Sequence, residues 1–234
     1  MNLWKSRCCR LFQRAAFVAA FAIAGHVIAA QPKAVTIGLI GDSTVATTYG
    51  WGPAFAKRCK DTVTVLNYAK NGATLDSRSR KLDELLQEKP DIVLVQFGHN
   101  DMKKYDAKDY GRKLTGYVER IKRAGAKAVV LSSVTRRHFD ETGKIAPRVV
   151  NGDRTLPQFA QAARSVAREQ VVPFIDLNAI SIEHHNRIGP EASVAYNFKE
   201  TDHTHFSPAG ASAIADLIIQ ELRVAVPELA VHLK

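Results

Sequence analysis

The sequence predicts one α/β domain built around a parallel sheet of five strands, with helices on both faces of the sheet. Short apolar runs rich in β-branched residues alternate with longer amphipathic stretches, the pattern typical of such sheets. Beyond residue 34 we find no internal repeat, low-complexity tract or linker rich in proline, glycine and serine, which favours a single domain. The 234 residues, 46% apolar and 24% charged, exclude a disordered or collagen-like chain.

The expected strands are short apolar runs. The clearest covers 91–97, a continuous run typical of a strand that is buried on both faces. Each run is followed by polar or turn-forming residues. Five runs are expected to form strands: 35–40, 63–68, 91–97, 128–132 and 171–175.

Helical periodicity separates these runs. Apolar residues recur at helical spacing from Tyr110 to Ile121 and within 154–170. Before the last helix, Ser207 is suited to cap the N-terminus and Pro208 to occupy the first turn. An earlier amphipathic segment, 55–60, carries Cys59, which we interpret as a half-buried structural thiol.

Residues 1–30 form a separate segment. Positions 1–14 carry basic residues and no acid, and positions 15–30 are almost wholly apolar and end in small residues. This pattern is typical of a secretory signal peptide. A membrane anchor or a buried helix is disfavoured, because the apolar part is short for a bilayer span and follows a basic head. We therefore expect a signal peptide over 1–30, only transient membrane contact, a mature domain over 31–234, and export to the periplasm or beyond the cell.

Four polar blocks lie where catalytic loops of a parallel sheet are expected, beyond the carboxyl ends of strands or before the last helix. Each block alone is a common turn or loop sequence, but together they contain a hydroxyl, an imidazole, a carboxylate and an amide. The blocks are Gly41-Asp42-Ser43-Thr44, Asn71-Gly72, Gly98-His99-Asn100-Asp101 and Asp202-His203-Thr204-His205.

These residue types fit acyl transfer. Ser43 offers a nucleophile, His205 a base and Asp202 a carboxylate that orients the base. The backbone N–H groups of Ser43 and Gly72, with the side-chain amide of Asn100, are suited to bind a developing oxyanion. Asp42 is interpreted as a turn-forming residue. The Gly-x-Ser-x-Gly elbow of ordinary α/β-hydrolases is absent, because Val45 stands at its last position.

The four blocks, in this order and spacing, resemble those of the SGNH (GDSL-like) hydrolases. Ser43, Gly72, Asn100 and His205 fall on the residues that name that family, and Asp202 falls on its triad acid. The resemblance implies a three-layer α/β/α flavodoxin-like domain. With Tyr49-Gly50-Trp51-Gly52 and 133–137, the blocks are similar to the rhamnogalacturonan acetylesterase branch. That similarity implies a secreted serine esterase that removes acetyl groups from a pectic polysaccharide.

Five further residues are candidates for substrate contact. Trp51 is either a sugar-stacking platform or a core residue, and His99 either lines the pocket or packs within a loop. Arg78, Arg136 and Arg137 follow the second and fourth strands, so they either reach the carboxylates of an anionic polymer or face water.

Other functions remain as alternatives. A GDSL-type lipase or thioesterase and a non-catalytic carbohydrate-binding protein are both open, as is the oligomeric state. No metal or other cofactor is expected, because the serine machinery is complete without one and His184, His185, His203 and His205 lack the zinc-binding His-x-x-x-His spacing. The formal net charge of +10 does not indicate nucleic acid in an exported protein.

Overall fold

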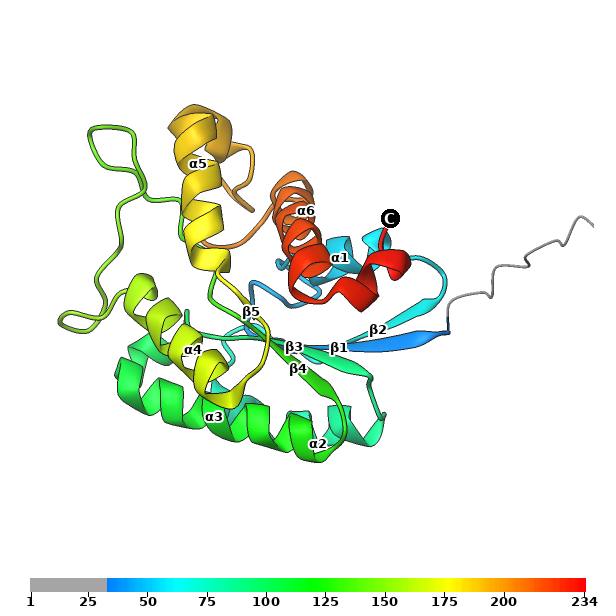
Figure 1. The fold of residues 1–234 in the computed structure, drawn as a ribbon. Helices are drawn as coiled ribbons and strands as arrows, with labels where there is room; N and C mark the ends of the chain where they lie inside the picture. Colours follow the sequence, from blue (N-terminus) through cyan, green and yellow to red (C-terminus); the bar gives the residue numbers. More distant parts are fainter. Residues whose placement is uncertain (1–32) are drawn as a thin grey trace, which may run out of the picture. The chain divides into compact units, whose positions relative to one another are not determined.

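The computed structural model describes residues 33–234, and the signal peptide expected over 1–30 lies outside them. Their centre is a sheet of five parallel strands in the order β2-β1-β3-β4-β5 (Figure 1). This is the flavodoxin-like order, so the prediction of an α/β fold with a five-stranded parallel sheet is confirmed. The strands are β1 (Val35–Gly41), β2 (Val63–Asn67), β3 (Ile92–Gln96), β4 (Lys127–Leu131) and β5 (Phe174–Ile175).

Helices cover both faces of the sheet (Figure 1). One layer holds α2 (Leu75–Gln87), α3 (Ala107–Arg123) and α4 (Leu156–Gln170). The other holds α1 (Gly52–Arg58), α5 (Leu177–Val194) and α6 (Pro208–Ala225). Two short 3-10 helices complete the described elements, η1 (Asp101–Lys103) and η2 (Pro227–His232).

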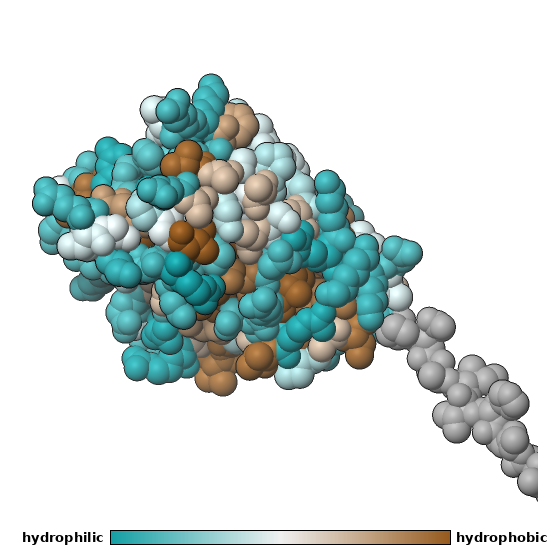
Figure 2. Space-filling model, turned by 90° about the horizontal axis from the view of Figure 1, so that it is seen from above, coloured by the Kyte–Doolittle hydropathy of each residue, from teal (hydrophilic) through white to brown (hydrophobic). Residues whose placement is uncertain are grey.

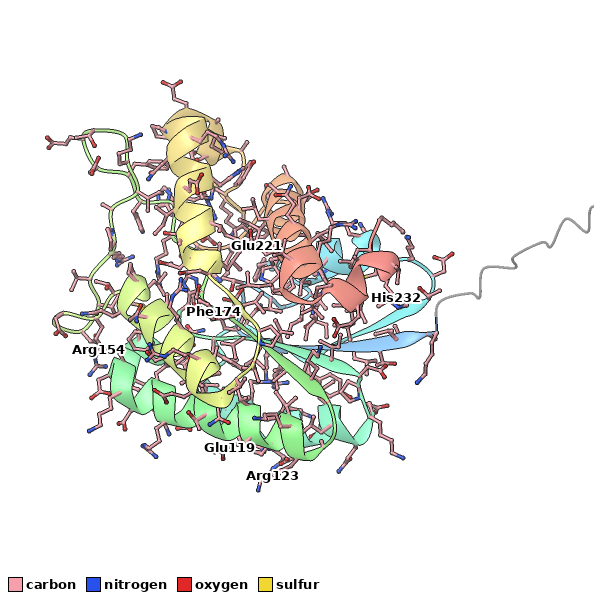
Figure 3. The ribbon with its side chains drawn as sticks, in the orientation of Figure 1. Glu119, Arg123, Arg154, Phe174, Glu221 and His232 are labelled. Atoms are coloured by element: carbon pink, nitrogen blue, oxygen red, sulfur yellow. The ribbon has the colours of Figure 1, made fainter. Side chains whose placement is uncertain are left out.

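The apolar strands explain the three layers. Side chains alternate across a strand, so β3 sends Ile92 and Leu94 to the core under α1 and α6, and Val93 and Val95 to the core under α2, α3 and α4. All five residues of β3 are buried. The helices are amphipathic in turn, and Glu119 and Arg123 lie on the outer side of α3 (Figure 3). The burial of β3 on both faces is what the continuous apolar run over 91–97 predicts.

The start of α6 agrees with the prediction. The Ser207 hydroxyl accepts a hydrogen bond from the Gly210 N–H at 3.1 Å, and Pro208 occupies the first turn. This cap fixes where α6 begins, directly after the block that contains Asp202 and His205.

The strand predicted over 171–175 is wrong in its first half. Val171 instead ends α4 with a left-handed φ of 54° and is 88% exposed, and only Phe174 and Ile175 pair with β4. Pro173 has no N–H to donate to a strand ladder.

Two helices were not predicted from the sequence, α2 and α5. Helix α5 is broken at Gly189, which has a φ of 81° and precedes Pro190.

The surface is mixed rather than apolar. Figure 2 views the molecule from above, and hydrophilic side chains surround scattered apolar ones on that face. Within 33–234 no helix is both long and apolar enough to span a bilayer.

Candidate active site

The structure brings Ser43, His205 and Asp202 into one hydrogen-bonded chain. His205 Nε2 lies 2.9 Å from Ser43 Oγ, and His205 Nδ1 lies 2.8 Å from Asp202 Oδ2. A carboxylate only accepts hydrogen bonds, so Nδ1 carries the ring proton and Nε2 is left to accept the Ser43 hydroxyl proton. Ser43 follows β1 beside β3, where the order of the strands reverses, which is where open α/β sheets bind ligands.

Asp202 is held as a charged group. Its Oδ1 accepts hydrogen bonds from the backbone N–H groups of Thr204 and His205, both at 3.0 Å. Burial raises the pKa of Asp202, but these N–H groups and the His205 ring outweigh burial and lower the pKa below its usual range. The carboxylate is therefore ionised when it orients the imidazole.

Hydrogen bonds among buried side chains stabilise the turn that carries Ser43. Asp42 Oδ1 accepts hydrogen bonds from the Thr44 backbone N–H at 2.9 Å and from the Thr44 hydroxyl at 2.7 Å. Gln96, at the end of β3, donates to the Thr44 hydroxyl and accepts from Trp51 Nε1 at 2.8 Å. Asp42 is fully buried and bonds Thr44 within the turn, which fits its interpretation as a turn-forming residue.

Trp51 is therefore not a sugar-stacking platform. The ring is 1% exposed and packs edge-on against Phe55, in the core under α1. It supports the serine turn through Gln96 instead of meeting substrate.

The loops that carry Gly72 and Asn100 lie against each other. Asn100 Nδ2 donates to the Ala73 carbonyl at 3.1 Å, which uses one of its two amide hydrogens. Gly72 has a φ of +72°, and a Cβ built there meets no atom within 4 Å. A side chain at Gly72 would thus be strained by its backbone, although no neighbouring atom would obstruct it.

Arg137 is a buried brace, not a substrate contact. Its guanidinium donates to Asn197 Oδ1 at 2.6 Å and to the carbonyls of Asp202 at 3.1 Å and His205 at 2.5 Å. It also lies 5.0 Å from the Phe206 ring centroid. Burial lowers the pKa of Arg137 to about 10, and the charge of Asp202 offsets part of that effect. The side chain is 2% exposed, so the prediction of substrate contact is wrong.

His99 is also buried. Its Nε2 lies 2.9 Å from the Val134 carbonyl, which links the loop after β3 to the loop after β4. Burial, with the positive charge of Arg136, lowers the pKa of His99 well below its usual value, so the ring is neutral. At 2% exposed it does not line a pocket.

A family comparison covers the whole of this site. The family model of the GDSL-like lipase/acylhydrolases matches residues 39–213, which contain all four polar blocks. The chain belongs to the GDSL-like lipase/acylhydrolase family. It is accordingly a carboxylic ester hydrolase.

Relatives and solved structures agree with this family. The chain is 33% identical to rhamnogalacturonan acetylesterase RhgT of Bacillus subtilis, over 86% of this chain and 94% of RhgT. It is 28% identical to the probable rhamnogalacturonan acetylesterase YesY of the same organism, over 80% and 92% of the two chains. The crystal structure of Bacillus subtilis YxiM superposes with a TM-score of 0.70 at 25% identity, over 81% of this chain and 56% of that one.

A more distant structure shares the fold alone. The acetylxylan esterase Axe2 of Geobacillus stearothermophilus superposes with a TM-score of 0.64 at 19% identity, over 81% of this chain and 94% of Axe2.

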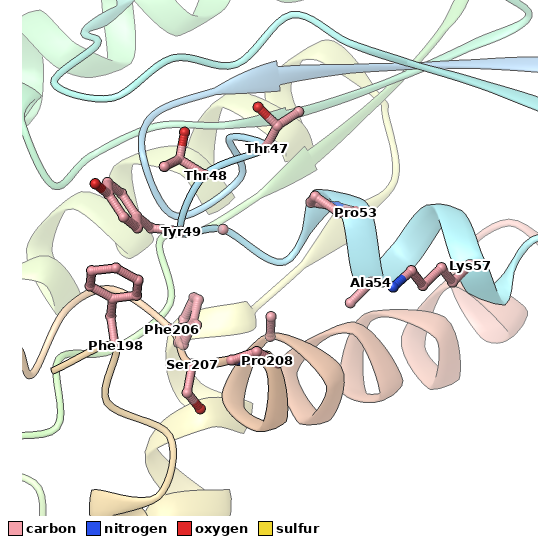
Figure 4. A pocket seen from close by; sticks show the side chains of 12 residues that line it. Thr47, Thr48, Tyr49, Pro53, Ala54, Lys57, Phe198, Phe206, Ser207 and Pro208 are labelled. Carbon is pink, nitrogen blue, oxygen red and sulfur yellow. The ribbon is translucent and has the colours of Figure 1, made fainter.

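A pocket of about 260 Å³ is lined by Tyr49 and by Phe206 and Ser207, the two residues that follow His205 in the chain (Figure 4). Ser43, Asp202 and His205 are not among its lining residues. The Tyr49 ring lies 5.3 Å from the His205 ring and 4.4 Å from Phe198, between centroids. Phe198 was not predicted from the sequence, because a single exposed aromatic residue in a loop has no periodicity that marks it. The lining combines aromatic and proline rings with hydroxyls and one ammonium: Tyr49, Phe198, Phe206, Pro53, Pro208, Thr47, Thr48, Ser207 and Lys57.

The two remaining candidate arginines, Arg78 and Arg136, are both partly buried. Arg136 is half-buried, and its Nη1 lies 3.4 Å from Thr204 Oγ1, beside the triad. Arg78 donates a hydrogen bond to the Tyr68 carbonyl at 2.8 Å. Its side chain therefore contacts the segment that connects β2 to Gly72. Contact of either side chain with substrate stays a prediction.

The other histidines have local partners. His184 Nε2 lies 3.1 Å from Tyr196 Oη, and His185 Nδ1 lies 2.9 Å from Ser193 Oγ. The His203 ring lies 4.8 Å from that of His138. Across residues 33–234, no three His, Cys, Asp or Glu side chains are grouped so that they would hold a metal ion.

Proposed function

We propose that this GDSL-like hydrolase is an exported serine esterase that removes acetyl groups from a polysaccharide, a pectic rhamnogalacturonan in particular. The observation that carries the proposal is the hydrogen-bonded chain from Ser43 through His205 to Asp202. The names of RhgT and YesY support acetyl as the acyl group and rhamnogalacturonan as the polymer.

In the first half-reaction, Ser43 Oγ attacks the ester carbonyl while His205 Nε2 takes the hydroxyl proton. Asp202 keeps the ring oriented and stabilises the imidazolium that forms. The carbonyl oxygen becomes an anion, which the N–H groups of Ser43 and Gly72 and the free amide hydrogen of Asn100 stabilise. His205 then gives its proton to the sugar oxygen, and the carbon–oxygen bond to the sugar breaks. Acetyl-Ser43 and a sugar hydroxyl remain.

The second half-reaction repeats these steps with water. His205 takes a proton from water, and the resulting oxygen attacks the acetyl carbonyl of acetyl-Ser43. The tetrahedral intermediate collapses, His205 returns the proton to Ser43 Oγ, and acetic acid leaves and gives its own proton to the solvent to become acetate. The enzyme is restored with every proton accounted for.

The pocket lined by Tyr49 and Phe206 supports a sugar rather than a long acyl chain. Sugars present apolar C–H faces and many hydroxyls, and the lining offers the rings of Tyr49 and Phe198 together with threonine and serine hydroxyls. A lipase or thioesterase for long chains is the second candidate, because Phe206 and the prolines of the same pocket are apolar. The intact hydrogen-bonded chain disfavours a non-catalytic binding protein.

Export rests on the leader sequence. The basic and apolar pattern of 1–30 supports a cleaved signal peptide and a product in the periplasm or outside the cell. N-terminal sequencing of protein recovered from those fractions tests this, and a chain that still begins at Met1 in the cytoplasm would contradict it.

Acetate release from a substrate panel tests the function. The panel holds acetylated rhamnogalacturonan, acetylated xylan, 4-nitrophenyl acetate and a 4-nitrophenyl ester of a long fatty acid. We expect the highest kcat/KM on the rhamnogalacturonan, and strong loss of turnover in Asp202→Asn, because the amide favours the wrong tautomer of His205. Preference for the long-chain ester would favour the lipase.

A further inference from the structure

Three cationic side chains gather beside the triad, and we call Lys103, Arg136 and Arg148 the cation cluster. Lys103 Nζ lies 3.2 Å from Asn100 Oδ1, on the residue proposed for the oxyanion hole. Arg136 Nη1 lies 3.4 Å from Thr204 Oγ1, within the block that holds Asp202 and His205. Arg136 and Arg148 line one narrow cleft together. Lys103 and Arg136 thus lie next to the proposed oxyanion hole and the triad, on the loops after β3 and β4, and Arg148 lies next to Arg136.

No carboxylate of the described chain pairs with this cluster. The salt bridges formed within 33–234 involve none of its three members. Asp42 and Asp202 attract Arg136, but Asp42 bonds Thr44 and Asp202 bonds His205. The charge of the cluster is thus left without a counter-charge of its own.

This arrangement is unfavourable in the free protein. Arg136 Nε is buried without a hydrogen-bond partner. Burial lowers the pKa of Arg136 and the nearby Arg148 lowers it further, while burial and then Arg136 lower the pKa of Lys103. A half-buried guanidinium with like charges around it gains from an anionic ligand, which satisfies its donors and relieves the repulsion.

We propose that the cation cluster is a subsite for a carboxylate of the substrate, on a uronic acid residue next to the acetylated sugar. The inference rests on the proposed function, because it assumes a polysaccharide acetylesterase, and it adds that the polymer is recognised by its charge. A planar guanidinium matches a carboxylate in forked geometry, and Lys103 adds a third donor from the side of Asn100. Neutral xylan would leave all three cations unpaired.

The test compares one polymer in two charge states. Acetylated rhamnogalacturonan is assayed for acetate release beside the same polymer with its uronate carboxylates methyl-esterified. Wild type should prefer the charged form by about tenfold or more in kcat/KM, and the preference should shrink as salt rises to about 0.5 M. In the variant Lys103→Gln, Arg136→Gln, Arg148→Gln the ratio of the two kcat/KM values should fall towards one. The ratio is the readout because it cancels any change in the chemical step.

Controls separate the proposal from general charge effects. Arg168→Gln removes an exposed charge on α4 without touching the cluster, so the ratio should stay at the wild-type value. Arg136→Lys keeps the charge but not the fork, so it should keep part of the preference. Equal rates of wild type on both polymers, or a triple variant with the wild-type ratio, would overturn the subsite alone. Hydrolysis of 4-nitrophenyl acetate with no acetate from either polymer would overturn the proposed function and the subsite with it.

Discussion

Replacement of Arg137 by methionine should weaken the fold and the triad together. The guanidinium makes three hydrogen bonds to acceptors on the chain 197–205. Bonds from a charged donor contribute at least about 1.5 kcal/mol each, so their loss removes about 4–5 kcal/mol. Methionine restores some packing on Phe206 and removes the buried charge, so we expect a net loss of about 3 kcal/mol in the free energy of unfolding.

The same change should slow the chemistry more than it weakens binding. Arg137 is buried and does not contact substrate, but it holds the carbonyls of Asp202 and His205. A displacement of about 1 Å in a catalytic group lowers turnover by roughly a hundredfold. We therefore expect kcat for 4-nitrophenyl acetate to fall by about that factor, with a smaller change in KM.

Urea unfolding followed by circular dichroism, with kinetics on the same preparations, measures both effects. Arg137→Lys keeps the charge but reaches fewer acceptors, and should be intermediate in both. Arg136→Met is the matched control for stability. Arg136 is next to Arg137 in the sequence, but its side chain makes one long hydrogen bond, to Thr204 Oγ1 at 3.4 Å. This variant should therefore change the unfolding free energy by less than about 1 kcal/mol. Wild-type stability and kcat in Arg137→Met would refute the role of Arg137 as a brace.

Three further predictions concern other parts of the chain. Burial raises the pKa of Asp101 from 3.8 to about 7, so between these values the folded chain keeps a proton that the unfolded chain loses, and stability falls as pH rises. Asp101→Asn should remove up to about 4 kcal/mol of that fall, measured by urea unfolding from pH 4 to 7, and an unchanged slope would contradict it. Burial raises the pKa of Cys59 to about 11, so its thiol should not react with 5,5′-dithiobis(2-nitrobenzoate) at pH 8 until the protein unfolds, and a fast native reaction would count against this. Phe198→Ala should lower the ratio of kcat/KM on polymer to that on 4-nitrophenyl acetate by roughly two- to tenfold, and an unchanged ratio would exclude Phe198 from the sugar pocket.

The sequence predicted those parts of the fold that depend on local pattern. Strands buried on both faces show as continuous apolar runs, and a serine followed by proline marks the start of α6. The second half of α5 has no such pattern, because Gly189 and Pro190 interrupt it. The apolar pair Val171-Val172 resembled a strand, although Val171 ends a helix with its side chain in water.

Site residues divide in the same way. Ser43, Asp202 and His205 were found because their chemistry and spacing form a motif. The burial of Trp51, His99 and Arg137 depends on partners 45, 35 and 60 residues away, so no local pattern distinguishes these side chains from exposed ones. Lys103 and Arg148 were missed for a related reason, since unpaired charge appears only when the loops are brought together.

Covalent labelling tests the central claim, that Ser43 is the nucleophile of a serine esterase. A fluorophosphonate ester should react with one site per chain, peptide mass spectrometry should locate the adduct on Ser43, and esterase activity should fall in proportion to labelling. Ser133→Ala, which removes a buried serine that bonds the Phe97 carbonyl, should label as wild type does, whereas Ser43→Ala should neither label nor release acetate while it keeps its circular dichroism spectrum. Labelling of another residue, or acetate release by Ser43→Ala near the wild-type rate, would contradict the account.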